Sequence, residues 1–190
     1  MTLPGNRLLV ITDETQCFDD TVLRRLVEAR SGGPFSVVVR DKHMSPRWRR
    51  GLTEELKRAD FEVIVADPPD SEARVHLSAQ AELPNHAVTC LGRSWHQGDG
   101  IPSSRTLDYV TYSPIWASAS KPGYGPTVGI DGLGAFCGAA PIPVYALGGV
   151  ETPERIHAAR AAGAYGVAVM GAVMRSVEPA EVVRRFNDAL

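Results

Sequence analysis

The chain has 190 residues, of which 44% are hydrophobic and 22% charged, as in an ordinary globular protein, and its length predicts one domain over residues 1–190. The formal net charge of −2 argues against a nucleic-acid-binding surface, and no apolar run has the length of a membrane span. Met1–Arg7 lacks the pattern of a signal peptide, and three widely spaced cysteines fit a reducing compartment, so we expect a cytoplasmic protein.

Eight short runs are rich in β-branched residues and predict buried parallel strands, because most are apolar throughout instead of alternating. In chain order these runs are Arg7–Thr12, Phe35–Arg40, Glu62–Ala66, Arg74–Leu77, Ala87–Gly92, Leu107–Tyr112, Pro143–Leu147 and Tyr165–Met170. Amphipathic or capped stretches between and after them predict helices over Asp19–Arg30, Pro46–Ala59, Val128–Gly138, Pro153–Ala162 and Pro179–Leu190. Ser45 and Thr152 are natural N-caps, and each is followed by a proline at the first helical position.

Strands that alternate with helices predict an α/β protein, specifically a compact (β/α)8 TIM barrel. Such barrels typically need about 250 residues, so we expect several helices to be shortened or missing. The connections Asp67–Ala73, Leu83–His86 and Gly98–Thr106 are too short or too turn-like for a full helix. A doubly wound sheet is the alternative, but Thr12–Asp19 contains no glycine fingerprint after the first strand.

Glycines follow the last two predicted strands, where TIM barrels commonly bind phosphate. Gly148 and Gly149 end the seventh strand, and Met170 and Gly171 end the eighth. Glycines let an oxyanion approach backbone N–H groups closely. We expect a phosphate-binding site here; the alternative is that the glycines only form tight turns.

Two further segments offer groups that suit a phosphate or pyrophosphate. Arg40 and Lys42 flank Asp41 at the end of the second strand and point to the same side, although they could equally form a solvated charge cluster. The loop after the sixth strand, residues 113–125, carries two hydroxyls and a lysine that could cradle an oxyanion or close as a lid. Its relevant residues are Ser118, Ser120 and Lys121. An exposed connector is the alternative.

Three histidines, His43, His76 and His96, fall near strand ends and could bind zinc or act as a general base. No two of them have a recognised metal-ligand spacing, so we expect no metal site from this set. Cys17, in the first strand-end loop, could also face the barrel mouth.

Taken in order, the segments of this chain resemble the family of thiamin phosphate synthases and TenI-type thiazole tautomerases. The resemblance runs through almost the whole chain, from Ile11–Asp13 through Arg40–Lys42, Val75–Leu77, Gly92–His96, Ser113–Ile115 and Ala146–Gly149 to Ala162–Met170. It implies a TIM barrel of thiamin biosynthesis that binds a small phosphorylated thiazole. Oligomeric state stays open, with a homo-oligomer as one option.

The family's synthase joins an aminopyrimidine diphosphate to a thiazole phosphate, releases pyrophosphate and uses Mg²⁺ held by two aspartates. The resemblance assigns phosphate binding to the residues that match its motifs: Arg40, Lys42, Ser94, Ser118, Ser120, Lys121, Gly148, Gly149, Met170 and Gly171. Three positions depart from the pattern. Val38 replaces a glutamine, Asp67 stands alone at the first metal position, and Ala81 occupies the second. Losing a carboxylate weakens a Mg²⁺ site and the charge stabilisation of departing pyrophosphate.

These departures favour a tautomerase-like enzyme that needs no metal, in which Arg93 pairs with a substrate carboxylate. That branch's histidine and cysteine acid–base pair falls on Pro114 and Ser120, so proton transfer must come from elsewhere. We expect His96 as the base, with Ser94 and Lys121 as the other catalytic candidates. A synthase with Mg²⁺ at a rearranged site around Asp67, or a non-catalytic ligand-binding relative, remain the alternatives.

Overall fold

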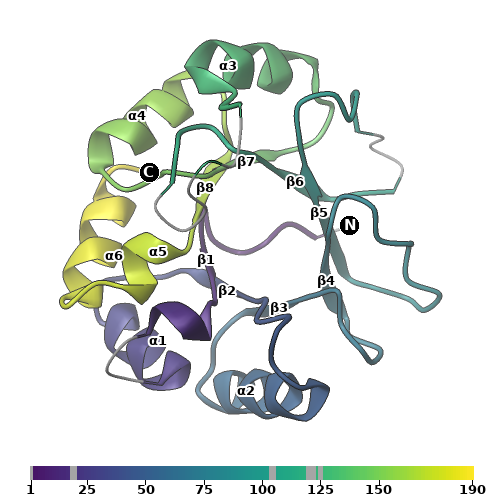
Figure 1. Cartoon of the computed structure of the whole chain (residues 1–190), viewed down its shortest axis with the longest axis vertical. Coiled ribbons are helices and arrows are strands. Elements are labelled where there is room, and N and C mark those ends of the chain that lie inside the picture. Colours follow the sequence, from purple (N-terminus) through teal and green to yellow (C-terminus); the bar gives the residue numbers. More distant parts are fainter. Residues whose placement is uncertain (1, 18–20, 103–105, 119–122, 124–125) are drawn as a thin grey trace.

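The computed structural model describes residues 2–17, 21–102, 106–118, 123 and 126–190. Its eight parallel strands form a closed barrel in sequence order, β1 to β8, and β1 pairs with β8 to complete the ring (Figure 1). The predicted (β/α)8 barrel is therefore confirmed. The strands are β1 Leu8–Ile11, β2 Ser36–Val39, β3 Val63–Ala66, β4 Arg74–Leu77, β5 Cys90–Trp95, β6 Tyr109–Tyr112, β7 Val144–Leu147 and β8 Gly166–Val169.

Helices cover one side of this barrel far more completely than the other. Those in the described residues are η1 Glu14–Gln16, α1 Val22–Arg30, α2 Pro46–Arg58, α3 Gly129–Ala139, α4 Pro153–Ala161, α5 Gly171–Met174 and α6 Pro179–Asp188. The expected caps form: the Ser45 hydroxyl accepts the Trp48 N–H at 3.2 Å, and Thr152 accepts that of Arg155 at 3.4 Å. Within the described residues, the connections from β3 to β6 contain no helix (Figure 1), as their length predicts. None of the helices described is both long and apolar enough to cross a bilayer.

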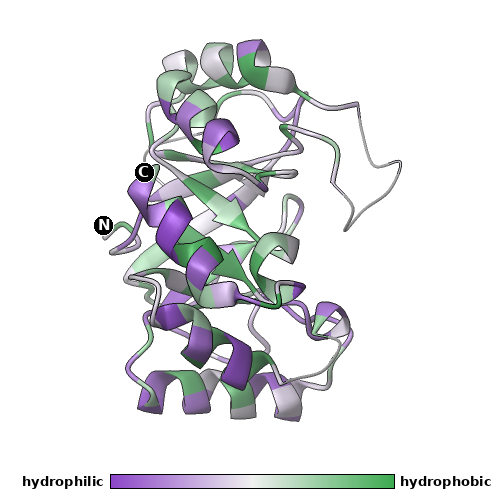
Figure 2. Ribbon diagram, turned by 90° about the vertical axis from the view of Figure 1, so that its left-hand side faces the viewer, coloured by the Kyte–Doolittle hydropathy of each residue, from purple (hydrophilic) through white to green (hydrophobic). Residues whose placement is uncertain are grey.

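Alternation along the strands divides the buried side chains into an inner and an outer layer. The inner layer fills the barrel and includes Leu9, Val38, Ile64, Tyr109 and Tyr145. The last two rings meet edge to face with centroids 5.3 Å apart, a geometry that aromatic pairs prefer. The outer layer packs the strands against the helices, whose ribbons carry both hydrophilic and hydrophobic residues (Figure 2).

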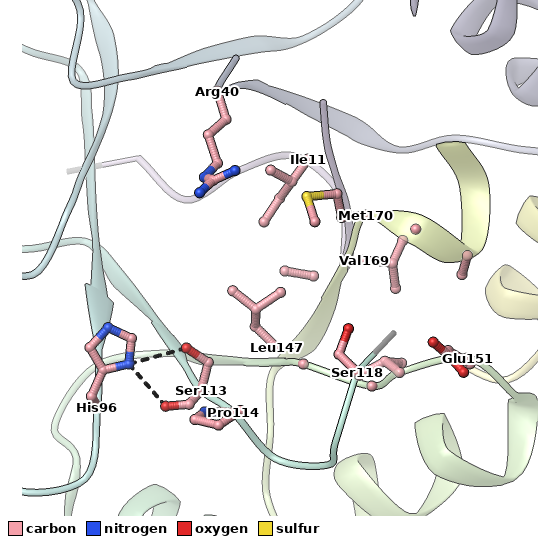
Figure 3. A pocket seen from close by; sticks show the side chains of 16 residues that line it. Ile11, Arg40, His96, Ser113, Pro114, Ser118, Leu147, Glu151, Val169 and Met170 are labelled. Carbon is pink, nitrogen blue, oxygen red and sulfur yellow. Dashed lines mark hydrogen bonds between the residues drawn. The ribbon is translucent and has the colours of Figure 1, made fainter. Parts of the chain in front are cut away.

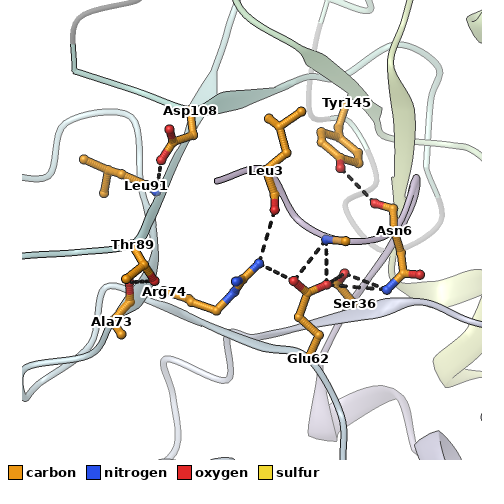
Figure 4. A network of polar contacts seen from close by, with 11 residues as sticks. Leu3, Asn6, Ser36, Glu62, Ala73, Arg74, Thr89, Leu91, Asp108 and Tyr145 are labelled. Atoms are coloured by element: carbon orange, nitrogen blue, oxygen red, sulfur yellow. Dashed lines mark hydrogen bonds and ion pairs between the residues drawn. The ribbon is translucent and has the colours of Figure 1, made fainter. Parts of the chain in front are cut away.

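Polar side chains at the amino ends of the strands close the bottom of the barrel (Figure 4). The Glu62 carboxylate accepts the Gly5 N–H at 2.8 Å and forms an ion pair with Arg74. The Tyr145 hydroxyl donates to the carbonyl of Asn6 at 2.8 Å. The N-terminal segment is thereby fixed across this end, which leaves the carboxyl ends of the strands as the open mouth.

Two element predictions need correction. The fifth strand begins at Cys90 and continues to Trp95, whereas the apolar pattern predicts it over Ala87–Gly92. The apolar pattern misled there because Arg93 and Ser94 are polar residues within the strand. The short helix α5 also begins directly at Gly171, where the sequence predicts no helix.

Candidate active site

A pocket opens at the barrel mouth, mainly between the carboxyl ends of β6, β7 and β8 (Figure 3). It is lined by Ile11, Arg40, His96, Ser113, Pro114, Ser118, Leu147, Gly148, Gly149, Val150, Glu151, Ala168, Val169, Met170, Gly171 and Ala172. Seven of the predicted site residues are among them: Arg40, His96, Ser118, Gly148, Gly149, Met170 and Gly171. The structure therefore brings these seven together, from five different strand ends.

Backbone N–H groups form one wall of this pocket. Gly148 and Gly149 both have positive φ angles, +98° and +66°, which favour glycine. Gly171 and Ala172 are the first residues of α5, whose opening N–H groups have no partner within the helix. In the described part of the chain, these four N–H groups donate to no other group. Such a set of convergent donors suits the oxygens of a phosphate.

Neighbouring loops hold the glycine turn in place. The Leu147 and Gly148 carbonyls accept the N–H groups of Ile115 and Trp116 at 3.0 and 3.1 Å. The guanidinium of Arg155 donates to the Gly149 carbonyl at 2.5 Å and lies over the Trp116 ring. These contacts occupy the carbonyls of the turn and hold Gly148 and Gly149 at the pocket wall.

Arg40 supplies a positive charge on the opposite side of the pocket (Figure 3). Its backbone N–H donates to the Thr12 hydroxyl at 2.9 Å, and that hydroxyl donates to the buried carboxylate of Asp41. Asp41 also accepts the Glu14 N–H at 2.6 Å. The ends of β1 and β2 are therefore fixed together, and Asp41 is part of this support and not a partner for the neighbouring cations.

Lys42 does not line the pocket, because its ammonium group forms an ion pair with Asp67 at the end of β3. The other oxygen of Asp67 accepts the Ser78 N–H at 2.9 Å. Burial alone would raise the pKa of Asp67, but the hydrogen bonds from Lys42 and Ser78 outweigh it and lower that pKa below its ordinary value. The expectation that Arg40 and Lys42 act as a pair is corrected to Arg40 alone in the pocket wall.

These residues do not fit a Mg²⁺ site built by the protein itself. Both oxygens of Asp67 are engaged, and Ala81 offers no carboxylate at the second position. Within the described residues, no three His, Cys, Asp or Glu side chains gather closely enough to hold a metal ion. Mg²⁺ prefers several oxygen ligands in near-octahedral geometry, and this chain supplies too few at the expected place.

His96 forms part of the pocket wall next to Ser113. Its Nδ1 lies 3.0 Å from the Ser113 carbonyl oxygen and 3.3 Å from the Ser113 hydroxyl (Figure 3). A carbonyl can only accept, so Nδ1 carries the proton in this contact. Ser113 was given no role from the sequence; its position directly after β6 was the available signal.

Other candidates lie away from the pocket or outside the described residues. Arg93 faces outward from β5, where its guanidinium donates to the Ala79 carbonyl at 2.9 Å, so it does not line the pocket. The sequence predicts Arg93 to follow the fifth strand, but it lies within β5, where the alternation of side chains turns it away from the barrel interior. Cys17 packs near Met174, and burial raises the pKa of its thiol to about 11, so the thiol stays protonated at neutral pH. Ser120 and Lys121 lie outside the residues that the structure describes.

Ser94 points into the barrel beneath the pocket, where its hydroxyl lies 3.1 Å from Nε2 of the buried His76. Glu151, which the sequence does not predict as a site residue, lines the pocket and lies 3.7 Å from the Arg175 guanidinium. It follows the glycine turn after one intervening residue, Val150, but nothing in its local pattern distinguishes it from an ordinary surface glutamate.

Comparison with known proteins gives consistent matches. A family model described as thiamine monophosphate synthase matches residues 8–173. A protein of Geobacter sulfurreducens named putative thiamine-phosphate synthase is 30% identical, over 93% of this chain and 91% of that protein. The thiamine-phosphate synthase of Vibrio campbellii is 29% identical over 91% and 92% of the two chains. The match to the Salinibacter ruber synthase is 40% identical but spans only 44% of this chain and 36% of that protein.

Among solved structures, the thiamine phosphate pyrophosphorylase of Pyrococcus furiosus superposes with a TM-score of 0.74 at 20% identity, over 96% of this chain and 94% of that one. The enzyme of the same name from Bacteroides thetaiotaomicron gives a TM-score of 0.67 at 17% identity. At these identities the superpositions support the shared barrel.

Proposed function

Because the chain belongs to the thiamine monophosphate synthase family, we propose that it is a thiamin phosphate synthase. This transferase joins an aminopyrimidine diphosphate to a thiazole phosphate and releases pyrophosphate. The sequence departures favour a tautomerase instead, but the relatives that match most of the chain carry synthase names. A cytoplasmic location, expected from the sequence, belongs to the same proposal.

The observation that carries the proposal is that Gly148, Gly149, Gly171 and Ala172, whose N–H groups have no acceptor among the described residues, line one pocket together with Arg40. N–H donors at a glycine turn suit the phosphate of the thiazole, because they satisfy its oxygens without a rearrangement of side chains. Arg40 suits the second anion, since a guanidinium can bind two phosphate oxygens at once. Two phosphorylated substrates can thus be oriented toward each other in one pocket, which lowers the entropic part of the barrier.

A second candidate is the tautomerase that the sequence departures favour. Two observations support it: Ala81 at the second metal position and His96 in the pocket wall. With its proton on Nδ1 toward Ser113, the imidazole has its basic nitrogen at Nε2, the arrangement that a general base needs. Two carboxylates are not required for this reaction, which moves protons within one substrate.

The test supplies the purified protein with both synthase substrates and saturating Mg²⁺, and measures thiamin phosphate. In parallel, a thiazole carboxylate phosphate is supplied and its isomerisation is followed. We expect thiamin phosphate to form and Arg40→Met to raise the KM for the diphosphate by about 10-fold or more, as loss of a charge-assisted contact predicts. Arg47→Met is the matched control, because Arg47 is exposed on α2 outside the pocket.

Isomerisation without thiamin phosphate formation, reduced about 10²–10⁴-fold by His96→Ala, would establish the tautomerase instead. Absence of both reactions, with phosphate binding retained, would identify a ligand-binding relative without catalytic activity.

A further inference from the structure

A chain of hydrogen bonds runs inside the barrel from its buried core to its mouth. His76 on β4 lies between Tyr109 on β6 and Ser94 on β5, with Nδ1 3.1 Å from the Tyr109 hydroxyl and Nε2 3.1 Å from the Ser94 hydroxyl. The Thr111 hydroxyl lies 3.5 Å from the same Nε2. His76 and Tyr109 are buried, whereas Ser94 is only partly buried, so the chain of hydrogen bonds ends at the residue nearest the solvent.

The direction of these hydrogen bonds follows from the surroundings of Tyr109. Its hydroxyl is fully buried, and in the described part of the chain its polar partner is His76 Nδ1. A buried O–H without an acceptor is costly, so the phenol donates to Nδ1. A neutral imidazole carries one ring proton, which therefore sits on Nε2 and is donated to Ser94. Burial lowers the pKa of His76 to about 4, so the ring is neutral at pH 7.

The Ser94 oxygen thus accepts from His76, and its own O–H is left to donate elsewhere. We propose that Tyr109 and His76 are positioning residues that fix the Ser94 hydroxyl as a hydrogen-bond donor toward an anionic ligand in the barrel mouth. The surroundings suit an anion, because Arg40 lines the same mouth with a positive charge, whereas the charge of Lys42 is already paired with Asp67. Two residues further along the chain, directly after β5, His96 lines the pocket. The inference rests on the proposed function only in taking the ligand to be a phosphate or diphosphate.

The first test determines the tautomer of His76 in the isotope-labelled, unaltered protein by long-range ¹⁵N–¹H correlation at pH 7. We expect a protonated, pyrrole-type Nε2 and an unprotonated, pyridine-type Nδ1. The opposite tautomer would overturn the inference, because Ser94 would then have to donate inward to His76. This measurement needs no substrate and no variant.

The second test measures the affinity for inorganic pyrophosphate by calorimetry in a double-mutant cycle. We expect Ser94→Ala to weaken binding about 10-fold, as loss of a hydrogen bond to a charged ligand predicts. Tyr109→Phe removes the donor that fixes the His76 tautomer, and should weaken binding about 3-fold with Ser94 present but not in the Ser94→Ala background. A loss of equal size in both backgrounds, as a merely structural role of Tyr109 predicts, would overturn the inference. Unchanged affinity in Ser94→Ala would do the same.

His76→Gln provides the conservative rescue, because its amide offers one acceptor for Tyr109 and one donor for Ser94. We expect it to bind pyrophosphate better than His76→Leu, which offers neither. Thermal unfolding checks that the variants are folded. If they are not, the tautomer of His76 in the unaltered protein decides whether the inference holds. Failure to form thiamin phosphate, with the tautomer and affinities as expected, would overturn the proposed function and leave this inference standing. Absence of pyrophosphate binding to the unaltered protein would overturn the inference itself.

Discussion

Substituting Gly149 by alanine tests whether the glycine turn after β7 is built for an anion. Gly149 has φ +66°, and a Cβ there would lie 2.5 Å from the Ala117 carbonyl oxygen and 2.7 Å from the Trp116 Cβ. The left-handed backbone costs about 1–2 kcal/mol for a residue with a side chain. Overpacking against the β6 loop adds about 1–3 kcal/mol. We expect Gly149→Ala to lower the free energy of unfolding by about 2–5 kcal/mol, measured by denaturant titration.

The matched control is Gly100→Ala. Gly100 has a similar φ of +76°, but a Cβ there would meet open space. It should lose only the backbone contribution, about 1–2 kcal/mol, and keep its affinity for inorganic phosphate. Gly149→Ala should weaken phosphate binding about 10-fold or more, since the loop that aims the N–H groups must shift. Equal stability losses in the two variants, together with unchanged phosphate affinity, would refute the reasoning.

Two further predictions concern charge. As the pH falls, the unfolded chain protonates His76 near its ordinary pKa of about 6.5, whereas the folded protein does so only near 4. The unfolded state therefore binds the proton first, and this residue should cost about 2 kcal/mol of stability between pH 7 and 4.5. His76→Gln should flatten the dependence of the unfolding free energy on pH in this range. An unchanged pH dependence would contradict the argument from burial. Separately, Arg40→Met should weaken pyrophosphate binding about 10-fold and reduce the salt dependence of that binding. Arg47→Met should leave both the affinity and its salt dependence unchanged. Equal losses of affinity in the two variants would show that Arg40 acts only through net charge.

The strands were predictable because each is a short apolar run whose neighbours in sequence are also its neighbours in the barrel. The runs Val37–Val39 and Val63–Val65 are apolar throughout and can be identified as buried strands from the sequence alone. The pattern failed at β5, where the polar residues Arg93 and Ser94 lie within the strand beyond its apolar start. Pairing with β4 and β6 along its whole length holds that segment extended, and a single sequence does not display such a partner.

The candidate site was predictable where it depends on strand ends and glycines, as at Gly148 and Gly171. It was not predictable where it depends on register between strands. The contact of His76 with Tyr109 requires β4 and β6 to place their inward residues at the same height, across an intervening strand with glycine at position 92. A Cβ at Gly92 would lie 2.1 Å from the Tyr109 ring, so that glycine makes room for the ring. None of these three residues signals the arrangement by its local pattern.

The carboxylate at the end of β3 gives the last prediction. Asp67 is engaged by Lys42 and by the Ser78 N–H, and position 81 is alanine. A cation that displaced Lys42 would gain one carboxylate, whereas Mg²⁺ needs near-octahedral oxygen coordination and gives up its water reluctantly. We therefore expect millimolar Mg²⁺ alone to leave the melting temperature unchanged, since a ligand stabilises a fold only as far as it binds the folded state.

Pyrophosphate changes this balance, because its own oxygens supply the ligands that the protein lacks. Mg²⁺ should then raise the affinity for pyrophosphate, and Asp67→Asn should reduce that gain while leaving binding without Mg²⁺ within about 3-fold. Glu72→Gln is the control, since Glu72 pairs with Lys57 on α2 and does not line the pocket. A clear rise in melting temperature with Mg²⁺ alone, lost in Asp67→Asn, would show that the protein itself holds the ion and that the missing carboxylate is replaced by another group. With Mg²⁺ bound only together with the diphosphate, the departures at positions 67 and 81 are compatible with synthase chemistry, because the substrate carries the ligands that the chain lacks.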